Sequence, residues 1–271
     1  MLRSSHRSAE PAARDGTAPA ISSAPARDRA PGPLAFLLVL FSEMLRMRLD
    51  WFWYLIQMSL NPLALLVFVY VLWDDPRAAQ FAVTGSLVVT MSTSAMLSLG
   101  QQVGWMKETN AYEHYAALPI SRKLLVAVIA TRGVLLSLPS ILTVALIGHV
   151  AMNVRITPLG VVILILGAYA MSGLGAFVGF WSKDGRMASM ATQVLATIII
   201  FLAPVYIPLE QMPGFLRYTA MAIPTTYVAR ALRLSAAGGG LSALWPDLTV
   251  LVGLALVSLL LVPLRLPWRR S

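Results

Sequence analysis

Side chains of the kinds used in catalysis or metal binding are few in this sequence and lie far apart. Cysteine is absent, and the three histidines are His6, His114 and His149. A lone histidine with no carboxylate or second histidine at helical spacing is more often structural than a metal ligand. The patterns G-x-x-x-x-G-K-[ST], H-E-x-x-H and G-x-S-x-G are also missing. We therefore expect no catalytic residue, no metal site and no cofactor on this chain.

Polar side chains are concentrated in one short segment, KETNAYEHYAALPISRK, from Lys107 to Lys123. Asn110, with Glu113 three residues later, forms a plausible capping pair. Pro119 forces the residue before it out of helical geometry. The pattern predicts a short helix over residues 111–118, after which Ser121 caps the next helix. A capped polar helix between two apolar runs indicates a docking element for a partner in the water, and an ordinary hairpin between two spans is the alternative.

The composition of the whole chain is that of a polytopic membrane protein. Hydrophobic residues make up 58%, charged residues 12%, and the mean hydropathy is +0.72. A helix needs roughly 20 apolar residues to cross about 30 Å of hydrocarbon. Six runs meet this need, over residues 51–73, 80–105, 124–152, 158–181, 190–207 and 248–264. We expect an all-α integral membrane protein with six transmembrane helices.

The net charge of +9 is explained by membrane topology. With the N-terminus in the cytoplasm, sixteen of the 21 basic residues fall on the cytoplasmic side and five on the other. The positive-inside rule then places both termini and the 111–118 helix in the cytoplasm. The basic character therefore requires no nucleic acid, and we expect none as a partner.

The chain before the first span divides into two parts. Residues 1–33 are rich in Ala, Pro, Ser and Arg, and are predicted to form a disordered cytoplasmic tail. From 34 to 50, Glu43, Arg46 and Asp50 share one helical face, which predicts an interfacial helix. The alternative is an irregular start to the first span. Residues 34–271 are expected to form the transmembrane domain.

Three features within the apolar runs bear on packing. Arg132 is costly at mid-bilayer, so it is expected near the cytoplasmic boundary, facing protein or headgroups. Gly175 and Gly179 allow a close helix contact, either within the chain or between two chains. The stretch 203–245 is interrupted by prolines and glycines and predicts short re-entrant helices between spans 5 and 6.

Two segments carry ordered motifs. The first, ETNAYEHYAALPISR, contains Glu108, Tyr112, Glu113, Leu118, Pro119, Ser121 and Arg122 at the motif positions. The second, APVYIPLEQMPGFLRYTAMAIPTTYVARALR, contains Pro204, Pro208, Pro213, Gly214, Phe215, Leu216, Pro224, Thr225, Leu232 and Arg233. Over about residues 34–266 the chain resembles the permeases of the ABC type 2 exporter family. The usual Gly-Thr pair is Asn110-Ala111 here, and the Asn before the late proline is Ile223.

The resemblance implies a permease built of two six-span halves, with a coupling helix between spans 2 and 3 that docks on an ATP-binding subunit. The implied partners are an ABC ATPase, in two copies, and a second permease chain, identical or related. ATP and Mg would bind to the ATPase, and the location would be a bacterial inner membrane. The implied coupling residues are Glu108, Tyr112, Glu113, Tyr115, Leu118, Pro119, Ser121 and Arg122.

The expected function is ATP-driven export of an amphipathic drug-like molecule, lipid or glycolipid. The candidates for the translocation path are uncharged polar residues of the spans: Gln57, Asn61, Gln101, Gln102 and Gln193. An ion-coupled secondary transporter or a channel is the alternative, although none of the twelve carboxylates lies in the middle of a span. An intramembrane enzyme is a further alternative, and it would need a buried acid/base or nucleophile pair.

Overall fold

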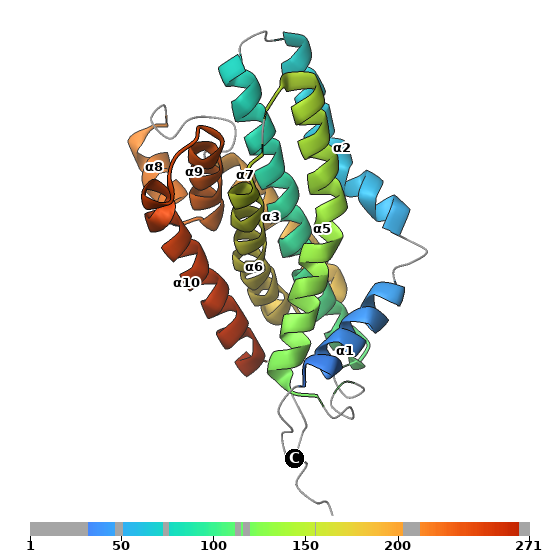
Figure 1. Ribbon diagram of the computed structural model, residues 1–271. Coiled ribbons are helices and arrows are strands. Elements are labelled where there is room, and N and C mark those ends of the chain that lie inside the picture. Colours follow the sequence, from blue (N-terminus) through green and yellow to red (C-terminus); the bar gives the residue numbers. More distant parts are fainter. Residues whose placement is uncertain are drawn as a thin grey trace, which may run out of the picture.

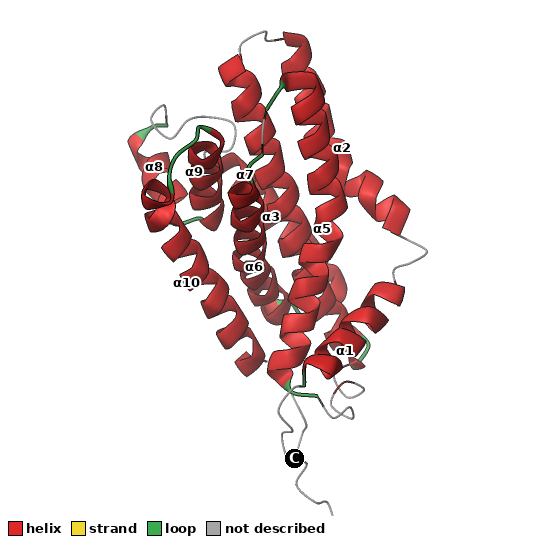
Figure 2. Ribbon diagram, viewed as in Figure 1, coloured by secondary structure: helices red, strands yellow, loops and turns green. Residues whose placement is uncertain are grey.

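The computed structural model describes residues 32–46, 51–72, 76–111, 115, 120–154, 156–202 and 212–265 (Figure 1). Within these ranges the chain is helical and contains no strand (Figure 2). The helices are α1 (Pro33–Arg46), α2 (Trp51–Leu72), α3 (Pro76–Glu108), α5 (Arg122–Met152), α6 (Pro158–Trp181), α7 (Gly185–Leu202), α8 (Gly214–Met221), α9 (Pro224–Ala236) and α10 (Leu241–Arg265). Residues 1–31 of the predicted tail lie outside these ranges.

Five of the described helices are long and apolar enough to cross a membrane. They are α3, α5, α6, α7 and α10. Helix α2 covers the predicted first span with 22 residues and has Pro62 in its interior. Its lower part turns away from the bundle (Figure 1). An all-helical membrane protein is therefore confirmed, whereas the number of six spans stays a prediction.

Two spans begin earlier than the sequence predicts. The fifth was expected over 190–207, but α7 starts at Gly185, because Asp184 accepts a hydrogen bond from the backbone N–H of Met187 at 2.7 Å and caps the helix. The sixth was expected over 248–264, but α10 starts at Leu241, directly after the glycine triplet, and Gly238 has a φ of +80°. The early turns of α10 are helical because Leu244 and Asp247 are buried against the bundle.

Helix α3 is the centre of the bundle. It packs against α2, α5, α6, α7 and α9, and most of its apolar length is buried inside the protein. Its contact with α6 is close because it is made through glycines. A β-carbon on Gly175 would lie 2.1 Å from the carbonyl oxygen of Met96, and one on Gly179 would lie 2.6 Å from that of Gly100. The Gly175/Gly179 pair therefore serves packing within the chain.

Two short helices precede the last span, as the sequence predicts. Helix α8 is mostly exposed, while α9 is buried between α3, α6 and α10. Thr226 fixes the corner between them by donating a hydrogen bond from its hydroxyl to the carbonyl oxygen of Ala220 at 2.5 Å. Their position in the outer leaflet stays a prediction, and residues 203–211 lie outside the described ranges.

Helix α1 is amphipathic, but the carboxylate of Glu43 faces inward. The predicted interfacial helix extends to residue 50, and the described helix ends at Arg46. Its half-buried Phe36, Val39 and Leu40 pack on the start of α5, and Glu43 is only 2% exposed. The exposed face is apolar and consists of Leu34, Leu37, Leu38, Phe41 and Leu45. Such a face suits the lipid side of an interfacial helix.

Candidate functional site

The predicted coupling segment lies where α3, α5 and α1 meet, at the lower end of the molecule in Figure 1. Of this segment, residues 111–118, the structure describes Ala111 and Tyr115. The predicted coupling residues Tyr112, Glu113, Leu118 and Pro119 lie outside the described residues. At Asn110 the backbone is left-handed, with a φ of 50°, as is usual where a helix ends. An N-cap residue is ordinarily extended, so Asn110 terminates α3.

Tyr115 points into the protein. Its side chain is 4% exposed and packs with Met106 of α3 and Leu125 of α5. Its hydroxyl donates a hydrogen bond to Oε1 of Glu43 at 2.7 Å. The coupling segment is therefore attached to α1 through a buried, charge-assisted hydrogen bond, which is stronger than one between neutral groups.

Glu43 also binds span 3. Its other oxygen, Oε2, accepts a hydrogen bond from Nη1 of Arg132 in α5 at 2.6 Å, and the same nitrogen lies 3.3 Å from Oε1 of Gln102 in α3. The Arg132 side chain is 12% exposed and that of Glu43 is 3% exposed. We call Glu43, Gln102, Tyr115 and Arg132 the inner polar cluster. Arg132 thus faces protein, one of the two surroundings that its sequence position predicted.

The inner polar cluster connects four parts of the chain around one carboxylate. Removing one member of a buried ion pair leaves the other as an uncompensated charge, so such pairs are costly to break. Glu43 can compensate Arg132 only when α1 lies across the start of α5. The pair therefore fixes the position of α1, and Tyr115 adds the coupling segment to the same assembly.

Two further predicted coupling residues lie at the start of α5. Ser121 has extended backbone angles, and its hydroxyl accepts a hydrogen bond from the N–H of Leu124 at 3.2 Å, so its predicted capping role is confirmed. Arg122 is exposed in the first turn of the helix. Their part in binding an ATPase stays a prediction.

Glu108, the remaining predicted coupling residue, binds the turn between α6 and α7. Its Oε2 accepts a hydrogen bond from the backbone N–H of Gly185, the first residue of α7, at 3.2 Å. Next to it, Nζ of Lys107 donates to the carbonyl oxygens of Phe180 and, at 3.0 Å, of Ser182. Sequence reasoning attributed no contact to Lys107.

The predicted path residues separate into two groups. Gln101 in α3 and Gln193 in α7 both donate to the hydroxyl of Ser189, at 3.2 and 3.3 Å, so they meet across the α3–α7 contact. Gln102 faces the other way and belongs to the inner polar cluster. The side chains of Gln57 and Asn61 lie outside the described residues. Sequence reasoning missed Ser189, whose position four residues before Gln193 was a usable signal.

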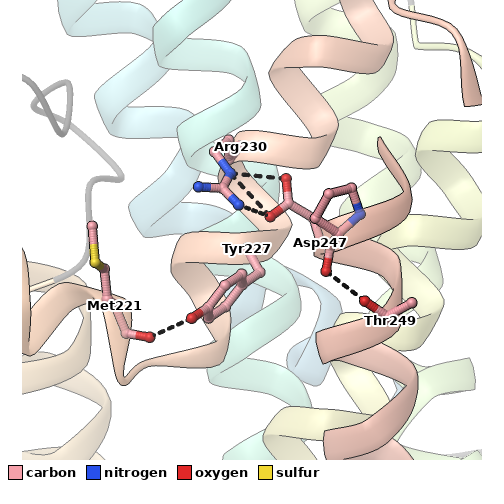
Figure 3. A network of polar contacts seen from close by, with 6 residues as sticks. Met221, Tyr227, Arg230, Asp247 and Thr249 are labelled. Carbon is pink, nitrogen blue, oxygen red and sulfur yellow. Dashed lines mark hydrogen bonds and ion pairs between the residues drawn. The ribbon is translucent and has the colours of Figure 1, made fainter. Parts of the chain in front are cut away.

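A second charged group joins α9 to the start of α10, which both lie above α1 in Figure 1, and Figure 3 shows this group from close by. Nε of Arg230 in α9 donates to both carboxylate oxygens of Asp247 in α10, at 2.9 Å each, and Asp247 is 1% exposed. The hydrogen bonds to Asp247 raise the pKa of Arg230, so its charge persists throughout the physiological range. Tyr227 adds a hydrogen bond to the carbonyl oxygen of Met221 at 2.7 Å. This group ties α8, α9 and α10 together.

Comparison with known families identifies this arrangement. A family model described as ABC-2 type transporter matches residues 35–236, which include the coupling segment and both short helices. The chain belongs to this family. No curated protein matches the sequence.

As an ABC-2 type transporter, the chain is a multi-pass membrane protein and a permease subunit, which in this family is a transport subunit and generally not itself catalytic. The family normally pairs with an ABC ATPase, and this is therefore the kind of partner that the family assigns to this chain. Among the described residues of the permease, no three His, Asp or Glu side chains come close enough to hold a metal ion.

The inner polar cluster of this permease was only half visible in the sequence. Arg132 was predicted to face protein or headgroups, but Glu43 was assigned to the polar face of an interfacial helix. A usable signal was the isolation of Glu43 within FLLVLFSEMLR, because a single carboxylate in an apolar helix requires a partner. The same reasoning applies to Asp247, which is followed by a long apolar run.

Proposed function

We propose that this permease exports an amphipathic drug-like molecule, lipid or glycolipid from the cytoplasm or inner leaflet, driven by ATP hydrolysis on a separate ABC ATPase. The 111–118 segment is the element on which the ATPase acts. The observation that carries the proposal is the attachment of Tyr115 to Glu43 and, through it, to Arg132. A force on the segment would reach α1 through the hydrogen bond of Tyr115 to Glu43, and α5 through the pair of Glu43 with Arg132.

The distribution of charge supports ATP as the source of energy. Ion-coupled transporters keep ionisable groups within their spans to carry the ion. Among the described carboxylates, Glu108 and Asp184 lie at helix ends, and Asp247 lies in the second turn of α10. Glu43 lies in α1 and is paired with Arg132 of α5. None of these is placed in the middle of a span.

The uncharged polar residues of α3 and α7 support an amphipathic cargo. Gln101, Ser189 and Gln193 provide amide and hydroxyl groups beside apolar side chains, and Gln193 is exposed. Such groups bind polar parts of a molecule without requiring a charge. We propose that this face lines the path and that a second permease chain, identical or related, completes it.

The proposed assembly contains two permease chains and two ATPase subunits in a bacterial inner membrane. Both termini and the 111–118 segment lie in the cytoplasm, in accordance with the positive-inside rule. The exposed apolar face of α1 rests in the cytoplasmic lipid interface, which brings Glu43 to the depth of Arg132.

The function is tested in inverted vesicles from cells that co-express the permease and a candidate ABC ATPase subunit from the same organism. We expect ATP to drive uptake of members of a panel of fluorescent amphipathic dyes, and a proton or sodium gradient without ATP to drive none. Uptake that follows an ion gradient, or that the permease achieves without the ATPase, would establish the secondary-transporter alternative instead.

A further inference from the structure

The end of α3 is fastened to the turn between α6 and α7 by two adjacent charged residues. Lys107 and Glu108 occupy the last two positions of α3. The turn runs from Ser182 to Gly185 and begins α7. We call Lys107, Glu108 and this turn the clamp.

Lys107 holds the beginning of the turn. Its ammonium group donates to the carbonyl oxygens of Phe180 and Ser182 at the end of α6, and lies 5.8 Å from the centroid of the Phe180 ring. The last carbonyl groups of a helix have no intrahelical partner and carry partial negative charge. The ammonium group therefore caps α6 from a different helix.

Glu108 holds the end of the turn. Its carboxylate accepts a hydrogen bond from the backbone N–H of Gly185, and Asp184 accepts one from Met187. The first N–H groups of a helix likewise lack intrahelical partners and favour negative charge nearby. The two charges of the clamp are thus matched in sign to the two helix ends that they bind.

The backbones next to the clamp are in close contact and leave little space for sliding. A β-carbon on Gly104 would lie 2.3 Å from the β-carbon of Ala188, and one on Gly185 would lie 3.3 Å from the Cα of Trp105. A shift of α7 along α3 would move the β-carbon of Ala188 away from Gly104, the position in α3 that leaves room for it. The contact is therefore specific to one register.

We propose that Lys107 and Glu108 are positioning residues that make α3, the α6–α7 turn and α7 move as one body when the ATPase displaces the coupling segment. The inference rests on the proposed function, since it names the spans that the coupling segment drives. The segment starts directly after α3, so force on it reaches the clamp within one turn of helix.

One consequence concerns the translocation path. Gln101 and Ser189 lie about two turns and one turn from the clamp, on α3 and α7 respectively. Because the clamp joins α3 and α7, the polar groups of Gln101 and Ser189 move together. The path then opens on the other side of this pair of helices.

The first test uses the permease without the ATPase. The chain has no cysteine, so the double variant Glu108→Cys with Gly185→Cys carries the only thiols. A short bis-methanethiosulfonate reagent is expected to link the two positions in most molecules. Adding Lys107→Met is expected to lower the linking rate at least roughly tenfold, the factor that corresponds to one lost charged hydrogen bond. Lys183→Met, which removes an exposed charge from the same turn, is expected to leave the rate unchanged. Equal linking rates in all three would overturn the clamp.

The second test measures dye uptake and ATP hydrolysis in the inverted vesicles, with a cysteine-free ATPase. Lys107→Met is expected to hydrolyse ATP but to transport roughly tenfold less per ATP. The unlinked cysteine pair is expected to be equally impaired and to regain transport when linked, because the link replaces the clamp. If linking abolishes transport, α3 and α7 must slide and the proposal is wrong. If the wild type shows no ATP-driven uptake, the proposed function fails, and the linking rates still decide whether the clamp exists.

Discussion

At the scale of single residues, Glu43 is the acceptor that joins α1 to α5 and to the coupling segment. It binds Arg132 at 2.6 Å and Tyr115 at 2.7 Å while only 2% exposed. A carboxylate in such surroundings is stable only while its partners remain in place.

Breaking the Glu43–Arg132 pair is expected to destabilise the permease by about 3 to 5 kcal/mol, because the remaining charge stays buried without the opposite charge that compensates it. Glu43→Ala and Arg132→Met should each lower the temperature of unfolding in detergent. The double variant should recover part of the loss, since it leaves no buried charge. A double variant no more stable than the worse single variant would contradict the pairing.

Tyr115→Phe removes the hydroxyl that donates to Glu43 and keeps the buried ring. Its expected cost in unfolding free energy is about 1.5 to 3 kcal/mol, the range for hydrogen bonds to charged groups. In the inverted vesicles, this variant should transport less per ATP hydrolysed, because the coupling segment then lacks the hydrogen bond from Tyr115 to α1. Unchanged transport per ATP would show that this hydrogen bond carries no part of the coupling.

The Arg230–Asp247 pair makes a corresponding prediction for α9 and α10. Arg230→Met leaves the Asp247 carboxylate buried and is expected to cost about 3 kcal/mol. Arg230→Met with Asp247→Leu should restore most of this. If the double variant is no more stable than Arg230→Met, other contacts of Arg230 dominate.

The raised pKa of Arg230 also predicts how stability depends on pH. The stabilisation linked to its charge is lost only as the pH rises through that pKa, so the stability that Arg230 contributes should be flat between pH 6 and 9.

At the scale of the elements, the closest contact is that of α3 with α6. Gly175→Ala would place a β-carbon 2.1 Å from the carbonyl oxygen of Met96, and backbone on both sides prevents easy relief. The expected loss is about 1 to 3 kcal/mol, as for overpacking. Gly253→Ala in α10 is the matched control, because nothing lies within 4 Å of its β-carbon. Equal stability of the two variants would contradict the packing.

Most of the helices were predictable because their signals are local. Residues 124–152 and 158–181 are apolar runs flanked by the caps Ser121 and Thr157, and the helices α5 and α6 match them within two residues. The starts of α7 and α10 were not predictable from hydropathy. Asp184 caps α7 ahead of its apolar run, and α10 continues on the N-terminal side of Pro246 and the buried Asp247.

The candidate site was predictable only in part, because its decisive contacts are distant in the chain. The segment 111–118 was found from its polarity and flanking residues. The contact of Glu43 with Tyr115 and Arg132 spans 72 and 89 residues, and no local pattern encodes such a pairing. Likewise, the hydrogen bond of Glu108 to Gly185 joins residues 77 apart in the chain, and the part of Glu108 in binding an ATPase stays a prediction.

At the scale of the whole molecule, the fold and the charge pattern predict a single orientation in the membrane. Lys183→Cys and Gly239→Cys lie on turns at opposite ends of the bundle, and the natural chain offers no other thiol. In intact cells, a membrane-impermeant maleimide should label Gly239→Cys only. In inverted vesicles it should label Lys183→Cys only. The reverse pattern would invert the topology and remove the coupling segment from the cytoplasm.

The central claim is that the 111–118 segment couples ATP hydrolysis to transport. The most direct measurement is ATP-driven dye uptake per ATP hydrolysed in inverted vesicles, comparing the wild type with Tyr112→Ala plus Glu113→Ala. The exposed Lys123→Met, just past the segment, is the matched control. We expect the double variant to be inserted and folded like the wild type but to lose uptake, and the control to retain it. Full uptake by the double variant would show that the 111–118 segment does not couple ATP hydrolysis to transport.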